Sequence, residues 1–278
     1  MKKHILITDV DNTLFDWFGM WHASFSALFD KVLEISCIPR ETLIGEMRSI
    51  FQKYGTSEYA FVLEECPSLK KMYQDPRKSL DEAVVAYKDA RAKSLHLYDG
   101  VYSTLTRLHQ RNIKVIAYTE SLQYYTAYRL ESLGIARLID VLYSPPDHEI
   151  AMQRDRSINE TAPELVKRLT PPGEFKPNPA ILKQIIDDAR ATAGDCIYVG
   201  DSEMKDIAMA NQAGVQSVLA RYGSSHFEER ADDYNLLRSV SHWSEADVER
   251  ERRLKAAQSD ISPDFTIDSF SEIISFFE

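Results

Sequence analysis

The sequence predicts an α/β fold in which helices wrap a parallel sheet and a mostly helical domain is inserted near the start of the chain. Three observations support this prediction. A short apolar run, Ile5–Ile7, opens the chain, only helical periodicity follows from Phe15 to Tyr98, and strand and helix patterns alternate after Gly100. Alternation of this kind favours parallel strands joined by right-handed crossovers.

The segment between Phe15 and Tyr98 predicts a small helical bundle. Its apolar residues recur at the spacing of one helix face within Trp17–Val32, Leu43–Phe51 and Leu80–Leu95. Turns are expected between the helices, at Pro39, Gly55, Pro67 and Pro76. We interpret the apolar stripes as packing between the helices of this bundle.

The rest of the chain predicts the sheet. Apolar runs predict strands at Ile113–Tyr118, Val141–Tyr143, Cys196–Val199, Val215–Ala220 and Phe265–Ile267. Amphipathic patterns predict helices at Val101–His109 and Leu122–Leu133, a helix that ends at Gly214, and a closing helix with Ile273, Ile274 and Phe277. Gly134 suits the position after Leu133, since glycine readily adopts the left-handed conformation that ends many helices.

Two polar stretches interrupt the alternation. Ser144–Glu174 carries a capping box at Thr161–Glu164, which predicts one short helix. Ser224–Ser262 is rich in both charge signs and predicts a helix near Glu245–Gln258, capped by Ser244. We expect both stretches to be surface elaborations, with a flap over the site or a subunit contact as the alternatives.

The composition limits the class of partner. The 278 residues carry a formal net charge of -10, with 44% hydrophobic and 27% charged residues. This balance is typical of a globular protein and argues against a nucleic-acid backbone or an acidic membrane as the main partner. No apolar stretch approaches membrane-spanning length, and the three cysteines show no CxxC spacing. We therefore expect reduced thiols and a cytoplasmic protein; the sequence does not define an oligomeric state.

Asp9 and Asp11 directly follow the first apolar run. Side chains repeat every two residues along a strand, so both carboxylates can lean toward one region. Two acids that close repel each other unless a cation lies between them or one of them holds a proton. The pattern therefore predicts a metal site or a nucleophile beside a general acid, with a solvated turn as the alternative. An EF-hand loop fits less well, because Leu14 and Met20 occupy its glycine and closing glutamate positions.

Other polar residues fall where ligands of parallel sheets bind, beyond the carboxyl ends of the strands. Thr119 ends one strand just before a helix, where a hydroxyl suits a phosphate. Lys176 precedes a Pro-Asn-Pro sequence that opens a helix, so its side chain can point away from that helix. Asp201 follows a buried strand and Asp206 lies in the first turn of the next helix, which together favour a metal or a lysine partner.

In this order and placement, the motifs resemble those of the haloacid dehalogenase-like hydrolase superfamily. The matching stretches are Asp9–Leu14, Leu97–Val101, Thr119, Lys176–Pro179, Gly200–Asp206 and Ala210–Val215. The resemblance implies a Rossmann-like, doubly wound catalytic core over residues 1–14 and 99–278, with insertions about 144–174 and 224–262. Residues 15–98 would form the helical cap domain of the family.

The resemblance also implies a Mg²⁺-dependent phosphomonoesterase that acts on a small phosphorylated metabolite. A nucleoside monophosphate, a sugar phosphate and phosphoglycolate are the candidate substrates. Asp9 would be the nucleophile that forms an aspartyl-phosphate, and Asp11 would be the general acid and base. The Asp9 carboxylate, the Asp11 main-chain carbonyl and Asp201 would hold the metal.

Three further roles follow from the same resemblance. Thr119 and Lys176 would bind the transferring phosphoryl oxygens, and Asp206 would orient Lys176 or a metal-bound water. Glu120 departs from the family, which often has Asn after the Thr. Its charge would repel substrate, favour a substrate with a positive group, or point to solvent, and we favour solvent.

Other functions are compatible with the same fold. A 2-haloacid dehalogenase uses no metal, and Asp11 and Asp201 oppose it because a halide leaving group needs neither a proton nor a cation. A phosphomutase would move the phosphate instead of releasing it. A non-catalytic member would bind a protein partner, which the intact set of acidic residues and Lys176 opposes.

Overall fold

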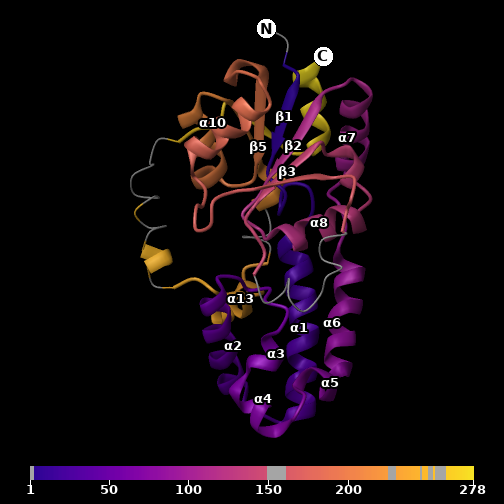
Figure 1. The fold of residues 1–278 in the computed structure, drawn as a ribbon, viewed down its shortest axis with the longest axis vertical. Coiled ribbons are helices and arrows are strands. Elements are labelled where there is room, and N and C mark those ends of the chain that lie inside the picture. Colours follow the sequence, from indigo (N-terminus) through magenta and orange to yellow (C-terminus); the bar gives the residue numbers. More distant parts are fainter. Residues whose placement is uncertain (1–2, 149–160, 225–229, 245, 250–252, 254–260) are drawn as a thin grey trace. The chain divides into compact units, whose positions relative to one another are not determined.

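The chain divides into two compact units, drawn in Figure 1. The computed structural model describes residues 3–148, 161–224, 230–244, 246–249, 253 and 261–278. Of these, the sheet unit holds residues 3–16, 96–148, 161–224 and 261–278, and the helical unit holds residues 17–95, 230–244, 246–249 and 253. Each unit is described by itself below.

The described part of the sheet unit forms a seven-stranded parallel sheet. Its strands are β1 (Ile5–Thr8), β2 (Lys114–Tyr118), β3 (Val141–Ser144), β4 (Val166–Leu169), β5 (Cys196–Gly200), β6 (Gln216–Ala220) and β7 (Phe265–Ile267). Their order is β4-β3-β2-β1-β5-β6-β7, so the winding reverses beside β1. The predicted α/β fold class is confirmed, and this reversal is where such sheets bind ligands.

Apolar sequence explains the central strands. β1 and β5 are buried along their whole length, as expected of parallel strands covered on both faces. The covering helices are α7 (Val101–Gln110), α8 (Gln123–Ser132), α10 (Pro179–Asp188), α11 (Ala208–Ala213) and the 3₁₀ helix η6 (Phe270–Phe277). Figure 1 shows α10 and α7 on opposite sides of the strands. Short helical turns complete the unit, namely η1 (Ala136–Leu138), η3 (Ala193–Asp195), the π-helical η4 (Glu203–Ile207) and η5 (Arg221–Ser224).

The segment after Thr161 forms a strand where the sequence predicted a helix. Residues 161–165 are turns and bends, and β4 then pairs in parallel with β3, with Val166 opposite Val141. The helix prediction from the capping box at Thr161–Glu164 was wrong. Hydrogen bonding to a neighbouring strand is a tertiary effect that outweighs the local capping pattern.

The helical unit is built from apolar helix faces, as predicted. Its elements are α1 (Trp17–Ser36), α2 (Arg40–Tyr54), α3 (Val62–Glu65), α4 (Pro67–Met72), α5 (Pro76–Ser79), α6 (Asp81–Ser94) and α13 (Tyr234–Val240). Aromatic rings stack along α1, with centroid distances of 6.3 Å for Trp17–Trp21 and 5.0 Å for Trp21–Phe25. α1 also packs along α6. The stacked rings and this helix pair form the core of the bundle.

A later part of the chain returns to this helical unit. The Tyr234 ring of α13 stacks on Phe18 at a centroid distance of 3.9 Å, and Gln52 donates a hydrogen bond to the Trp243 carbonyl at 3.1 Å. Residues 230–244 and 246–249 therefore group with the helices, whereas the sequence assigned about 224–262 to the catalytic core. Of the helix predicted near Glu245–Gln258, residues 246–249 and 253 are helical, and the others lie outside the described residues.

Two expectations from composition concern the whole chain. The cysteines at positions 37, 66 and 196 are all unpaired. Among the residues that the structure describes, no helix combines the length and the apolarity needed to cross a membrane.

Candidate active site

Three neighbouring strands of the sheet unit end close together. Thr8 of β1 lies opposite Ala117 of β2 and Val199 of β5, so the three strands run in register to their carboxyl ends. Asp9, Thr119 and Asp201 follow these strands, and the N–H of Asp9 donates to the Val199 carbonyl at 2.9 Å. The sheet therefore gathers residues from distant parts of the sequence at the edge where ligands bind.

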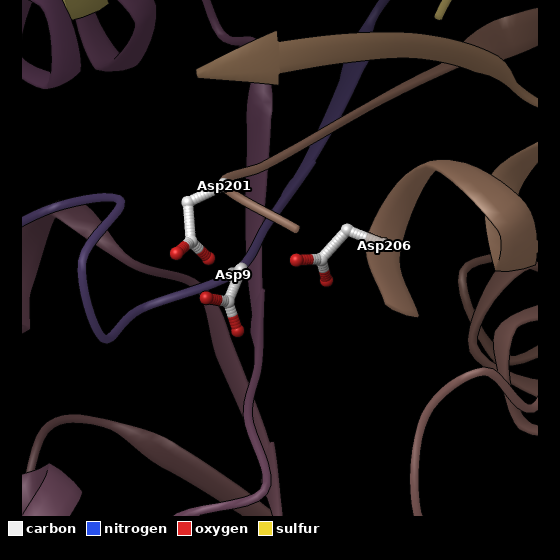
Figure 2. Close-up of side chains that lie close together, drawn as sticks. All are labelled: Asp9, Asp201 and Asp206. Atoms are coloured by element: carbon white, nitrogen blue, oxygen red, sulfur yellow. The ribbon is translucent and has the colours of Figure 1, made fainter. Parts of the chain in front are cut away.

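Three aspartates bring their carboxylates together at this edge. One oxygen each of Asp9, Asp201 and Asp206 lies within 4.8 Å of the others, and Figure 2 shows Asp201 and Asp206 directed toward Asp9. Burial raises the pKa of Asp9 to about 7, although Lys176 opposes the shift. Burial also raises the pKa of Asp201 well above its usual range, and the charge of Asp9 adds to the rise. A cation would stabilise such a cluster, which could therefore hold a metal ion.

The ammonium group of Lys176 lies beside the three carboxylates. Its Nζ donates to Asp9 Oδ1 at 2.6 Å and to Asp206 Oδ1 at 2.9 Å, and only 3% of the side chain is exposed. The ring centroids of Tyr118 and Tyr198 lie 4.9 Å and 5.7 Å from this nitrogen. Burial alone would lower the pKa of Lys176, but the carboxylates of Asp206 and Asp9 raise it well above its usual value. Lys176 is therefore a fixed positive charge next to Asp9.

Asp206 is held through both of its carboxylate oxygens. Oδ1 accepts from the Tyr198 hydroxyl at 2.8 Å as well as from Lys176, and Oδ2 accepts from the N–H of Ser202 at 3.2 Å. The carboxylate also lies against the backbone, because a Cβ at Gly200 would come within 2.3 Å of Asp206 Cγ. Only glycine can end β5 in this arrangement.

Asp11 has a different set of partners from Asp9. Its Oδ2 accepts from the hydroxyls of Thr119, at 3.4 Å, and Ser121, and its Oδ1 lies 3.4 Å from Nη1 of Arg129. The Asp11 side chain is 20% exposed, and that of Arg129 is 4% exposed. Two acids in one short motif thus have distinct surroundings, which is the condition for distinct acid–base roles.

Thr119 is fixed by its backbone and its hydroxyl. The residue is buried, its N–H donates to the Tyr143 carbonyl at 3.0 Å, and its Oγ1 accepts from the N–H of Ser121 at 3.0 Å. The same hydroxyl donates to Asp11. Thr119 therefore lies in the part of the site next to Asp11.

These site residues all lie within a segment that matches a known protein family. A family model described as haloacid dehalogenase-like hydrolase matches residues 4–214. The chain belongs to this family. The family membership predicted from the motifs is therefore confirmed, and the chain is a hydrolase of this family.

Relatives of this hydrolase include proteins named for two phosphatase activities. This chain is 28% identical to a glyceraldehyde 3-phosphate phosphatase of Methanopyrus kandleri over 84% of its own length and 90% of that protein. It is 24% identical to a phosphoglycolate phosphatase of Aliivibrio fischeri over 82% of this chain and 88% of that protein. A solved 2-haloacid dehalogenase from Pseudomonas syringae, 18% identical, has the same fold with a TM-score of 0.55, over 99% of this chain and 98% of that one.

Glu120 of this hydrolase does not point to solvent, and that interpretation of the sequence was wrong. Its Oε1 accepts from the N–H of Lys176 at 2.7 Å, and its Oε2 accepts from Lys205 Nζ at 2.7 Å. Burial alone would raise the pKa of Glu120, but Lys205 and Lys176 lower it below its ordinary value. A partly buried glutamate with two such donors is a charged structural partner of Lys176.

The sequence interpretation missed Ser121, Arg129, Tyr198 and Lys205. Arg129 had a detectable signal, because it lies four residues after Tyr125 and four before Leu133, on one face of the predicted helix. A basic residue on such a face needs a partner. Ser121 and Lys205 gave no such signal, since both lie in polar stretches next to recognised motifs.

Proposed function

We propose that this hydrolase is a Mg²⁺-dependent phosphomonoesterase that acts on a small phosphorylated metabolite through an aspartyl-phosphate. The observation that carries the proposal is the setting of Asp9, whose carboxylate lies 2.6 Å from the Lys176 ammonium and beside two further acids. This setting suits a nucleophile that must approach an anionic phosphate, because the lysine offsets the charge of the phosphoryl group. The two curated relatives named as phosphatases support the same reaction class.

The side chains present fit a divalent cation. Carboxylate oxygens are the ligands that Mg²⁺ prefers, and the oxygens of the three aspartates converge within 4.8 Å. Asp206 is already bonded to Lys176, Tyr198 and Ser202. We therefore assign the metal to Asp9 and Asp201, with the main-chain carbonyl of Asp11 as the third ligand that the family resemblance implies. When bound, Mg²⁺ would supply positive charge that offsets the charge of the phosphate.

In the first half of the reaction, a carboxylate oxygen of Asp9 attacks phosphorus and the bond to the leaving oxygen breaks. Asp11 gives its proton to that oxygen, so an alcohol leaves. Lys176 and Thr119 bind the equatorial phosphoryl oxygens during the transfer. The product of this half is a phosphoryl group bonded to Asp9.

In the second half, Asp11 accepts a proton from water while the water oxygen attacks phosphorus. The bond between phosphorus and the Asp9 oxygen breaks, inorganic phosphate is released, and both aspartates return to their starting states. Asp206 keeps Lys176 in place throughout, through the 2.9 Å bond to its Nζ.

The proposal is tested with p-nitrophenyl phosphate. We expect release of p-nitrophenol with Mg²⁺, its loss on addition of EDTA, and a fall of at least about 10³-fold in kcat for Asp9→Asn, because the amide cannot attack phosphorus. Asp187→Asn is a matched control, since Asp187 is an exposed acid on α10. It should keep wild-type activity.

Two results would contradict the proposal. Full activity of Asp9→Asn would end the nucleophile assignment, and release of halide from a 2-haloacid in the presence of EDTA would indicate the dehalogenase instead. If p-nitrophenyl phosphate is hydrolysed as expected, a screen of phosphorylated metabolites identifies the substrate, beginning with the substrates named for the two relatives.

A further inference from the structure

Glu120 and Lys205 form an ion pair that reaches Lys176 from its main-chain side. The Glu120 carboxylate accepts from Lys205 Nζ with one oxygen and from the N–H of Lys176 with the other, both at 2.7 Å. The side chains of Glu120 and Lys205 are 24% and 33% exposed. Short bonds to an ionised carboxylate are among the stronger hydrogen bonds in proteins.

One helical turn holds both ends of Lys176. Lys205 and Asp206 are adjacent in η4. Asp206 accepts from the Lys176 ammonium, and Lys205 binds Glu120, which accepts from the Lys176 backbone. Asp206 thus holds the tip of the lysine directly, and Lys205 holds its main chain through Glu120, so the position of the charge beside Asp9 depends on both contacts.

We propose that the Glu120–Lys205 pair positions Lys176 and neutralises the negative charge that Glu120 brings close to the phosphate-binding residues. This inference rests on the proposed function. It assigns two separable effects, since the carboxylate oxygen positions the lysine, whereas the charge of Lys205 protects the affinity for an anionic substrate.

The positioning effect is tested at Glu120. In Glu120→Gln/Lys205→Met the amide oxygen still accepts from the Lys176 N–H and no ammonium competes for it, so we expect kcat within about threefold of wild type. In Glu120→Ala no acceptor remains, and displacement of Lys176 should lower kcat by roughly 10- to 100-fold. Equal kcat values for the two variants would overturn the positioning role.

The charge effect is tested at Lys205. In Lys205→Met the Glu120 carboxylate stays negative without its partner, so KM for the phosphate ester should rise by about tenfold or more, and Lys205→Arg should restore it. The double variant Glu120→Gln/Lys205→Met is neutral again and should recover most of the affinity. If the double variant binds no better than Lys205→Met, the neutralising role is wrong.

A matched control breaks a comparable ion pair elsewhere in the sheet unit. Arg168 Nη1 lies 2.6 Å from Asp188 Oδ2, and Arg168→Met should leave kcat and KM within about twofold of wild type. Affinity for inorganic phosphate with Mg²⁺, measured by calorimetry, should rank the Lys205 variants as KM does. A different ranking overturns the inference. If the variants rank as expected but the wild-type protein hydrolyses no ester, the proposed function alone is overturned.

Discussion

At the scale of single residues, the site separates two acids that are neighbours in sequence. Asp9 is buried against the Lys176 ammonium, and Asp11 is half-buried among two hydroxyls and Arg129. A group that must stay available as a nucleophile and a group that must exchange protons need such different surroundings. The division of labour proposed for the pair is therefore consistent with the contacts of each side chain.

The role of Asp11 gives a prediction that depends on the leaving group. Asp11→Ala should lower hydrolysis of alkyl phosphates by about 10²- to 10⁴-fold, because an alkoxide leaves poorly without a proton. The initial release of p-nitrophenol should fall much less, since this leaving group is stable as an anion. Rapid-quench measurement of the first turnover with both substrate types checks this. Equal losses for the two would contradict the acid role, and Asp99→Asn, at an exposed position of the same unit, is the control.

At the scale of elements, the sequence was sufficient for the strands that build the site. β1, β2 and β5 are apolar runs, and polar residues follow each of them, so Asp9, Thr119 and Asp201 could be placed before the structure was known. β4 could not be predicted, because the short sequence VKRL is mostly exposed and only its pairing with β3 makes it a strand.

The contacts among site residues were also beyond the sequence. Glu120 meets Lys176 and Lys205, which lie 56 and 85 positions further along the chain. Arg129 meets Asp11 across 118 positions. Pairings over such separations are decided by tertiary structure, and no local pattern contains them.

The start of α10 gives a prediction at the element scale. Asn178 Oδ1 accepts from the N–H groups of Ala180 and Ile181 at 3.1 Å and 3.2 Å, so Asn178→Ala should cost about 1 kcal/mol of stability. Lys176 lies two residues before this cap, and we expect kcat to fall as well. Urea unfolding and steady-state kinetics measure both effects.

The matched control for this cap is Asp75, which accepts from the N–H of Lys78 at 3.1 Å and caps α5. Asp75→Ala should lose comparable stability with kcat unchanged. If both variants lose turnover equally, the effect of Asn178 is general and does not act through Lys176.

At the scale of the whole molecule, an acidic chain concentrates buried carboxylates at one edge of its sheet. The formal net charge is -10, and Asp9 and Asp201 both have a raised pKa. Without a metal ion, ionisation of these groups opposes folding, because burial makes each of them harder to charge. Protons and a divalent metal should therefore act on the stability of the protein in a related way.

This coupling predicts the pH dependence of stability without metal. Folding raises the pKa of Asp9 from 3.8 to about 7, so its proton stabilises the fold fully below about pH 4 and this contribution is lost as the pH rises to about 7. Asp201 shifts in the same direction. In EDTA, the part of the stability due to these groups should fall over this range, and added Mg²⁺ should raise Tm more near pH 8 than near pH 5.

Thermal unfolding followed by circular dichroism checks this prediction. Asp201→Asn is the informative variant, because it removes one proposed ligand and should abolish most of the Mg²⁺ effect. An increase of Tm that is equal at both pH values would show that Mg²⁺ acts elsewhere on the protein.

The stacked aromatic residues of the helical unit have a consequence for spectroscopy. The chain has three tryptophans, and all of them, Trp17, Trp21 and Trp243, belong to this unit. Indole fluorescence therefore reports on the helices alone, while the chromophores of the sheet unit are tyrosines and phenylalanines. On one sample, tryptophan emission thus follows the melting of the helical unit, whereas the far-ultraviolet signal follows the backbone of the whole chain. A difference between the two midpoints would show that the units melt separately, without any attached label.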